Sequence, residues 1–157
     1  MKRLIVVLLF AVQAHADVDL GVGMTSVIGR YVPAASGAYV SDTWMMSGST
    51  TGVRSSVYYV SAYTLAGYYS WKAGDFWWGP LYAGFGGGVG YSQRGYRNGT
   101  SASLSNDTDL NIGPAFRLTW MILGSCYVNF DAIWGVGIPS IELAGQDNVI
   151  FSIGWRL

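Results

Sequence analysis

The stretch DLNIGPAFRLTWMILGSCYVNFDAI, residues 109–133, decides the fold of this chain. Before its centre at Leu123-Gly124-Ser125, the even positions from 110 to 122 are apolar, while the odd positions are mostly polar or small. After the centre the alternation continues, with Asn129 and Asp131 interleaved between apolar residues. Strict alternation of this length predicts β-strands. We therefore expect a hairpin of two antiparallel strands joined by a tight turn.

The same period of two recurs along the chain and sets the number of strands. The clear spans are 17–30, 80–93, 108–122, 126–138 and 148–157, and a sixth is expected over 57–71. Residues 31–56 must hold two more strands if the count is eight, and within them only 38–46 resembles a strand. Six strands is the alternative, but so small a barrel has little interior to fill, so we favour eight.

The composition indicates which face of the sheet lies on the outside of the protein. Of the 157 residues 22 are Gly, only 11% are charged, and the formal net charge is zero, whereas globular proteins carry about 25% charged residues. The low charge argues against an ordinary cytosolic enzyme, the apolar content excludes a disordered chain, and the absence of basic excess excludes a nucleic-acid binder. The less apolar strand face carries Gly, Ser, Ala and Asn instead of the Lys and Glu of a soluble sheet. We expect an all-β, antiparallel, up-and-down transmembrane β-barrel with an apolar exterior.

The first sixteen residues read as a cleaved signal peptide. Basic Lys2 and Arg3 precede the apolar run 4–12, and Ala14 and Ala16 form a small-residue cleavage signal. Cleavage before Asp17 leaves 17–157 as a single barrel domain. His15 leaves with the signal, so the mature chain has no histidine.

The connections between strands differ in length, which predicts that the two ends of the barrel are different. Short turns are expected at 72–75 and 123–125, and longer polar loops at 31–52, 94–107 and 139–147. Short periplasmic turns and long extracellular loops are typical of outer-membrane barrels. Tryptophans beside the short turns and the C-terminus predict a periplasmic aromatic girdle: Trp71, Trp77, Trp78, Trp120 and Trp155. In loop 94–107, Arg94, Tyr96 and Arg97 are expected to contact lipopolysaccharide phosphates or a partner.

Turn positions also predict contacts inside the barrel. A turn centred on Gly124 pairs residues whose numbers sum to 248, so Arg117 lies opposite Asp131 and both point inward. An unpartnered buried guanidinium is costly, so we expect an interior ion pair. A turn centred near Phe76 places Tyr68 across from Gly84, and the Gly stripe 84-86-88-90 then makes room for tyrosine rings.

These features resemble the small eight-stranded outer-membrane barrels of the OmpA-transmembrane, OmpX and opacity-protein kind. The likeness covers the whole mature chain, although such proteins usually end in Phe and this one ends in Leu157. The resemblance implies the outer membrane of a Gram-negative bacterium, contact with its lipids and lipopolysaccharide, and insertion by the barrel assembly machinery.

The resemblance fixes no activity. Enzymes among small barrels rely on a histidine, and residues 17–157 have none. We therefore expect no enzyme, and no cofactor or metal is expected either, because the usual zinc ligands are missing. The leading hypothesis is a non-enzymatic barrel whose surface loops serve envelope integrity, adhesion or partner binding. A narrow pore for small solutes or ions and a soluble periplasmic β-barrel are the alternatives.

Overall fold

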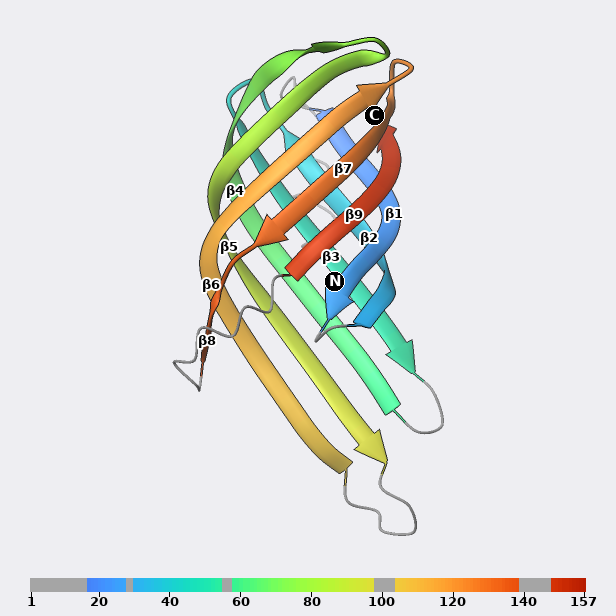
Figure 1. Cartoon of the computed structure of the whole chain (residues 1–157), viewed down its shortest axis with the longest axis vertical. Coiled ribbons are helices and arrows are strands. Elements are labelled where there is room, and N and C mark those ends of the chain that lie inside the picture. Colours follow the sequence, from blue (N-terminus) through green and yellow to red (C-terminus); the bar gives the residue numbers. More distant parts are fainter. Residues whose placement is uncertain (1–16, 28–29, 55–57, 98–103, 139–147) are drawn as a thin grey trace, which may run out of the picture.

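The computed structural model describes residues 17–27, 30–54, 58–97, 104–138 and 148–157. Nine strand segments lie in these residues, and together they form one antiparallel sheet that wraps around on itself (Figure 1). They are β1 (Asp17–Val27), β2 (Arg30–Val40), β3 (Trp44–Arg54), β4 (Tyr58–Phe76), β5 (Gly79–Arg97), β6 (Leu104–Ile122), β7 (Cys126–Ile133), β8 (Val136–Ile138) and β9 (Asn148–Arg156).

The sheet closes as an eight-stranded barrel. Each strand from β1 to β6 pairs with the next strand in the sequence, β9 pairs with both β7 and β1, and within the described residues no sheet edge remains along the main body. Strands β7 and β8 count as one wall, because both pair with β6 in the same register and only Trp134 and Gly135 separate them. The prediction of an all-β, antiparallel barrel is confirmed, and the number of strands is eight.

The barrel has two different ends. One end, here named the turn end, carries the connections at 41–43, 77–78 and 123–125 and also Leu157, which hydrogen-bonds to Val18. The other, the loop end, is where β1, β3, β5 and β8 finish. At the loop end β5 and β6 extend beyond the other strands (Figure 1). The tight turn at 123–125 lies where the sequence predicts it, with Leu123 and Gly124 at positive φ.

Two expectations for the first third of the chain were wrong. Residues 31–52 are not a loop, since nearly all of them belong to β2 and β3. The segment 38–46, expected to be a strand, instead contains the turn between those strands at 41–43, where Ser41 donates its backbone N–H to the Trp44 carbonyl over 2.9 Å. The small residues of β2 and β3 hide the alternation, whereas the turn is flanked by apolar residues that resemble a strand.

The β4–β5 hairpin also differs from its prediction. No turn begins at 72–75, because β4 runs on to Phe76 with a bulge between Lys72 and Gly74. The connection is the pair 77–78, so Tyr68 lies opposite Gly86 rather than Gly84. The shift of two residues preserves which face each residue occupies. At the loop end, β5 reaches Arg97 and β6 begins at Leu104, so the expected loop 94–107 is mostly strand.

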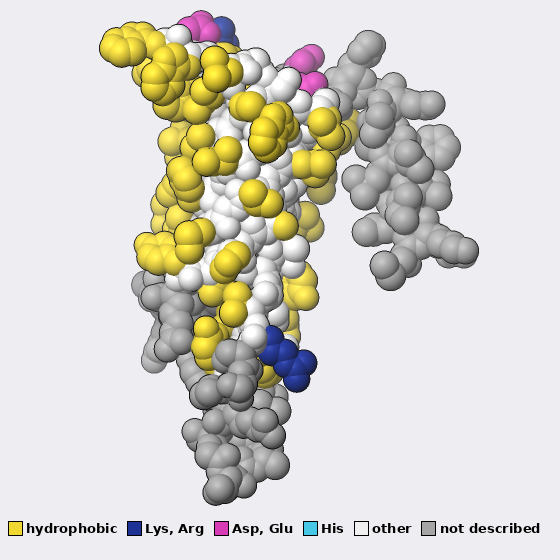
Figure 2. Space-filling view, turned by 90° about the vertical axis from the view of Figure 1, so that its right-hand side faces the viewer, with side chains coloured by type: hydrophobic (Ala, Val, Ile, Leu, Met, Phe, Trp, Pro, Cys, Tyr) yellow, Lys and Arg dark blue, Asp and Glu magenta, His cyan; other side chains and the backbone are white. Residues whose placement is uncertain are grey.

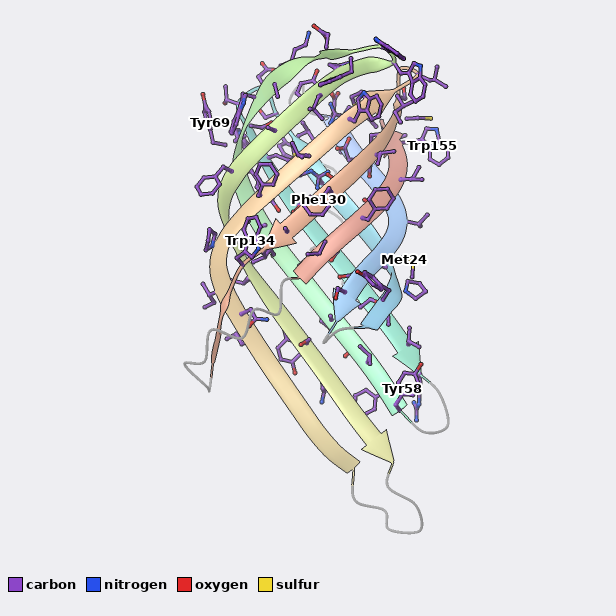
Figure 3. The ribbon with its side chains drawn as sticks, in the orientation of Figure 1. Met24, Tyr58, Tyr69, Phe130, Trp134 and Trp155 are labelled. Carbon is purple, nitrogen blue, oxygen red and sulfur yellow. The ribbon has the colours of Figure 1, made fainter. Side chains whose placement is uncertain are left out.

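Burial confirms that the barrel is inside out relative to a soluble protein. On β1 and β9 the outward positions are exposed and apolar: Leu20, Val22, Met24, Phe151, Ile153 and Trp155. The inward positions of the same strands are buried and mostly small or polar, including Asp19, Thr25 and Ser152. Tyr69 and Trp155 project away from the barrel in Figure 3, and Met24 and Phe130 are exposed as well. Figure 2 shows hydrophobic side chains along one face of the described part.

Candidate functional site

The interior of the turn-end half holds a network of charged side chains. Arg117 on β6 lies directly opposite Asp131 on β7, and Arg117 Nη1 is 3.1 Å from Asp131 Oδ2. These two side chains are only 3% and 6% exposed. The expected pair therefore stands inside the barrel, where it is shielded from solvent. Arg117 Nε also donates to Thr119 Oγ1 over 3.1 Å, which fixes the plane of the guanidinium.

Asp131 also connects walls that are far apart in the sequence. Its Oδ2 accepts a hydrogen bond of 3.0 Å from Ser47 on β3, and its Oδ1 accepts one from the Tyr68 hydroxyl on β4. Ser47 and Tyr68 are themselves 3.3 Å apart through their hydroxyl groups. These bonds run from β7 across the lumen to β3 and β4. The carboxylate therefore stands at the middle of a bridge through the barrel.

A second acidic residue, Asp19 on β1, extends the network. It is completely buried, with its Oδ2 3.4 Å from Arg117 Nη2. Arg156 on β9 holds the other side of the same carboxylate, with Nε 2.7 Å from Oδ1 and Nη2 3.1 Å from Oδ2. Arg156 also lies 3.8 Å from the exposed Asp17. Two buried carboxylates and two guanidinium groups thus balance each other in charge.

The sequence did not lead to Asp19 and Arg156, although both occupy inward positions of their strands. They face each other across the β1–β9 pairing. This pairing joins the first and last strands. Because no turn connects them, the register of the pairing cannot be worked out from the position of a turn. A cue existed in their sequence context, because each is a charged residue on an otherwise small or polar strand face.

Large side chains fill the space beside the network. Tyr127 is 1% exposed, and its hydroxyl lies against backbone that only glycine leaves open. A Cβ on Gly21 would lie 2.6 Å from this hydroxyl, and one on Gly154 would lie 2.5 Å from it. These inward glycines therefore make room for tyrosine, as does Gly84 for the Tyr68 side chain, whereas Gly88 of the expected stripe lies against Ala66 and Ile133. The lumen at this level is occupied by side chains.

The five tryptophans of the expected girdle gather towards the turn end. Trp71, Trp77, Trp78 and Trp155 are exposed, and Trp77 is 97% exposed at the tip of the β4–β5 hairpin. Trp120 is partly covered because Trp78 stacks on it, with ring centroids 5.6 Å apart and planes within 6°. Phe76 meets Trp120 edge-on at 6.3 Å. These tryptophans thus lie near one rim of the barrel, on β4, the β4–β5 turn, β6 and β9.

The residues expected to bind lipopolysaccharide lie at the opposite end. Arg94, Tyr96 and Arg97 belong to the loop end of β5, but their side chains lie outside what the structure describes. The signal peptide, residues 1–16, also lies outside the described part. Within the described residues no cluster of His, Cys, Asp or Glu is placed to hold a metal ion. In the same residues no helix is long and apolar enough to cross a membrane.

Comparison with known proteins identifies the fold only. The sequence matches no protein-family profile and no curated protein. Among solved structures, the N-terminal β-barrel domain of Pseudomonas aeruginosa OprF matches with a TM-score of 0.53 at 13% identity, over 90% of this chain and 97% of that one.

Two further solved barrels are similar at lower scores. Ail, the attachment invasion locus protein of Yersinia pestis, gives a TM-score of 0.45 at 11% identity, over 90% of this chain and 96% of that chain. Neisserial surface protein A gives 0.47 at 12%, over 90% and 91%. Both scores are below 0.5, so of these three barrels we use only the OprF domain as support for the fold, which the strand pairing already establishes.

Proposed function

We propose that this chain is a small, non-enzymatic integral protein of the outer membrane of a Gram-negative bacterium. The observation that carries the proposal is the inverted burial, with large apolar side chains outside and a charged network inside. An exposed apolar patch on a soluble monomer rarely exceeds about 300–600 Å². Here outward apolar residues occur on every strand of the main body, from Leu20 and Val22 to Phe85 and Ile112. A hydrocarbon environment removes the cost of exposing them, and a closed barrel leaves no unpaired backbone in it.

The two ends suggest an orientation. In the proposal the turn end, with its tryptophans, faces the periplasm and the inner leaflet, and the loop end faces the cell exterior. The surface loops would then serve envelope integrity, adhesion or binding of a partner. Arg94 and Arg97 stand at that end of β5, where guanidinium groups suit the phosphates of lipopolysaccharide. Insertion by the barrel assembly machinery belongs to the same proposal.

The interior supports a closed barrel rather than a pore for solutes. Eight strands enclose a space just wide enough for side chains to fill. Here Ser47, Tyr68 and Asp131 are hydrogen-bonded from wall to wall, and Tyr127 is packed beside them. Opening a path for ions would require breaking the bridge between β7 and the β3–β4 walls.

Two measurements test the proposal. Membrane fractionation with an unheated gel should place the chain in the outer membrane and show a mobility that shifts on boiling. Recovery from the soluble periplasm would refute the membrane assignment and support the soluble alternative. In planar bilayers the folded chain should give no persistent conductance. A steady open current would refute the closed lumen and favour the pore.

A further inference from the structure

The outer face carries a hollow in the middle of its apolar surface. Gly67 on β4, Gly87 on β5 and Pro114 on β6 face outward and stand side by side in one row of the sheet, because Gly67 pairs with Gly87 and Gly87 with Pro114. Above this floor lies a cavity of about 510 Å³. Met46 on β3, paired with Gly67, borders one end of it.

Bulky rows flank this floor on both sides. Towards the loop end, the outward residues Leu65, Val89 and Ile112 are paired with one another and line the cavity. Towards the turn end, the next outward row is Tyr69, Phe85 and Phe116. Alternate side chains on a strand are about 7 Å apart, so a row of two glycines and one proline between two bulky rows leaves a slot about one aliphatic chain wide. The hollow is therefore a groove across three strands.

The packing of the barrel itself does not require these glycines. A Cβ on Gly86 would lie 1.9 Å from the Gly67 carbonyl oxygen. Glycine is therefore the residue that fits at this inward position. By contrast, a Cβ on outward Gly67 would meet nothing within 4 Å, and one on Gly87 would meet only the Gly113 oxygen at 3.8 Å. Glycine weakens a strand and often marks the close approach of another molecule. The bare floor is thus consistent with a groove that serves something outside the chain.

We propose that the groove holds one acyl chain of a membrane lipid in a fixed position. This inference rests on the proposed membrane location, and it adds a defined lipid site to an otherwise uniform apolar exterior. The groove is continuous with that exterior and its walls are apolar, so a hydrocarbon chain can lie along it without leaving an apolar environment. A second hollow of about 210 Å³, floored by Gly37 and Gly48, shares Met46 and Leu65 with it and extends the path across β2 and β3.

A second copy of the chain fits this groove poorly. A stable protein interface buries about 800 Å² on each partner, whereas the floor is a single row of three small residues. The flanking residues also stand well above it, since Leu65 is 53% and Phe85 56% exposed. Another barrel would rest on these ridges and leave the floor uncovered. A flexible hydrocarbon chain can reach the floor.

The experiment uses lipid crosslinking with a variant that fills the groove. The chain is folded into phosphatidylcholine vesicles in which a small fraction of the lipid carries a diazirine near the end of one acyl chain. After irradiation, crosslinked residues are mapped by mass spectrometry in the natural sequence, in Gly67→Leu/Gly87→Leu and in the single variant Gly87→Leu. Gly52→Leu is the matched control, because Gly52 is outward and open but does not line the cavity.

In the natural sequence we expect labelling of Leu65, Val89 and Ile112 to exceed that of Val22 and Ile153 by threefold or more. Both filled variants should reduce the excess to the level of the other outward residues, and Gly52→Leu should retain it. Uniform labelling around a folded barrel would refute the proposed lipid site and leave the membrane assignment intact. An excess at Leu65, Val89 and Ile112 that persists in both filled variants would do the same. Association of copies in the vesicles, seen as fluorescence energy transfer between two differently labelled samples and lost in the filled variants, would show that a second copy occupies the groove instead of a lipid. If the natural sequence does not insert into the vesicles, both the proposed lipid site and the proposed function are refuted.

Discussion

Removing the guanidinium of Arg117 tests the interior network most sharply. Arg117→Met keeps the apolar stem but deletes contacts of 3.1 Å to Asp131, 3.4 Å to Asp19 and 3.1 Å to Thr119. Breaking a buried ion pair on one side costs about 3–5 kcal/mol. Asp131 still accepts hydrogen bonds from Ser47 and Tyr68. We therefore expect the lower part of that range, about 3 kcal/mol of unfolding free energy.

The double variant Arg117→Met/Asp131→Leu separates the pair from the rest of the network. It leaves no unpartnered charge at this position, and Asp19 still holds Arg156 at 2.7 Å. The loss should be smaller than the sum of the single losses by about 2 kcal/mol, within the range of about 0.5–3 kcal/mol typical of contacting residues. Some loss remains, because the Tyr68 hydroxyl then lacks its acceptor, although Ser47 can still donate to Tyr68.

The assay is urea unfolding of the barrel in vesicles, followed by tryptophan fluorescence and extrapolated linearly to zero denaturant. Lys72→Met is the control, because Lys72 forms an exposed ion pair with Asp75 at 2.8 Å and its loss should not move the midpoint. Single losses that add within about 0.5 kcal/mol in the double variant would refute a direct Arg117–Asp131 interaction.

Three further predictions use the same unfolding measurement. Tyr68→Phe removes one donor to a buried carboxylate and should cost about 1.5–3 kcal/mol; an unchanged free energy would contradict the bridge across the lumen. Gly86→Ala should destabilise by about 1–3 kcal/mol or more, because its Cβ meets backbone at 1.9 Å, whereas Gly87→Ala should be nearly neutral; equal effects would mean that the two faces are misassigned. Trp78→Ala should cost about 1 kcal/mol through the lost stacking on Trp120, whereas Trp77→Ala should cost less because Trp77 is 97% exposed; the reverse order would contradict the geometry of the cluster.

Sequence reasoning succeeded where a recognisable turn fixed the register. Leu123-Gly124-Ser125 lies between two strongly alternating strands, and its centre alone places Arg117 opposite Asp131. At the β4–β5 hairpin the predicted register is wrong by two residues. Lys72, Gly74 and Asp75 have the residue types of a turn, but the chain bulges there and continues as strand to the aromatic pair 77–78.

The remaining errors have one physical origin. Strands β2 and β3 consist largely of small residues, and a strand whose two faces both carry small side chains shows little alternation. Their pairing is imposed by the neighbouring walls, which no local pattern records. The same holds for Asp19 and Arg156, which meet only when the first and last strands close the barrel. Long-range closure is thus the part of the fold that local periodicity does not encode.

The central claim is that the apolar face of the sheet is in contact with lipid, and spin-label accessibility tests it most directly. In a Cys126→Ser background, single labels are placed at the outward positions Val22 and Ile153 and at the inward positions Thr25 and Ile150, and the barrel is folded into vesicles. The account predicts that oxygen, which concentrates in hydrocarbon, collides frequently with the outward labels, while a water-soluble nickel chelate does not reach them. Both reagents should be largely excluded from the inward labels. Ready access of the nickel chelate to Val22 and Ile153 would contradict the claim.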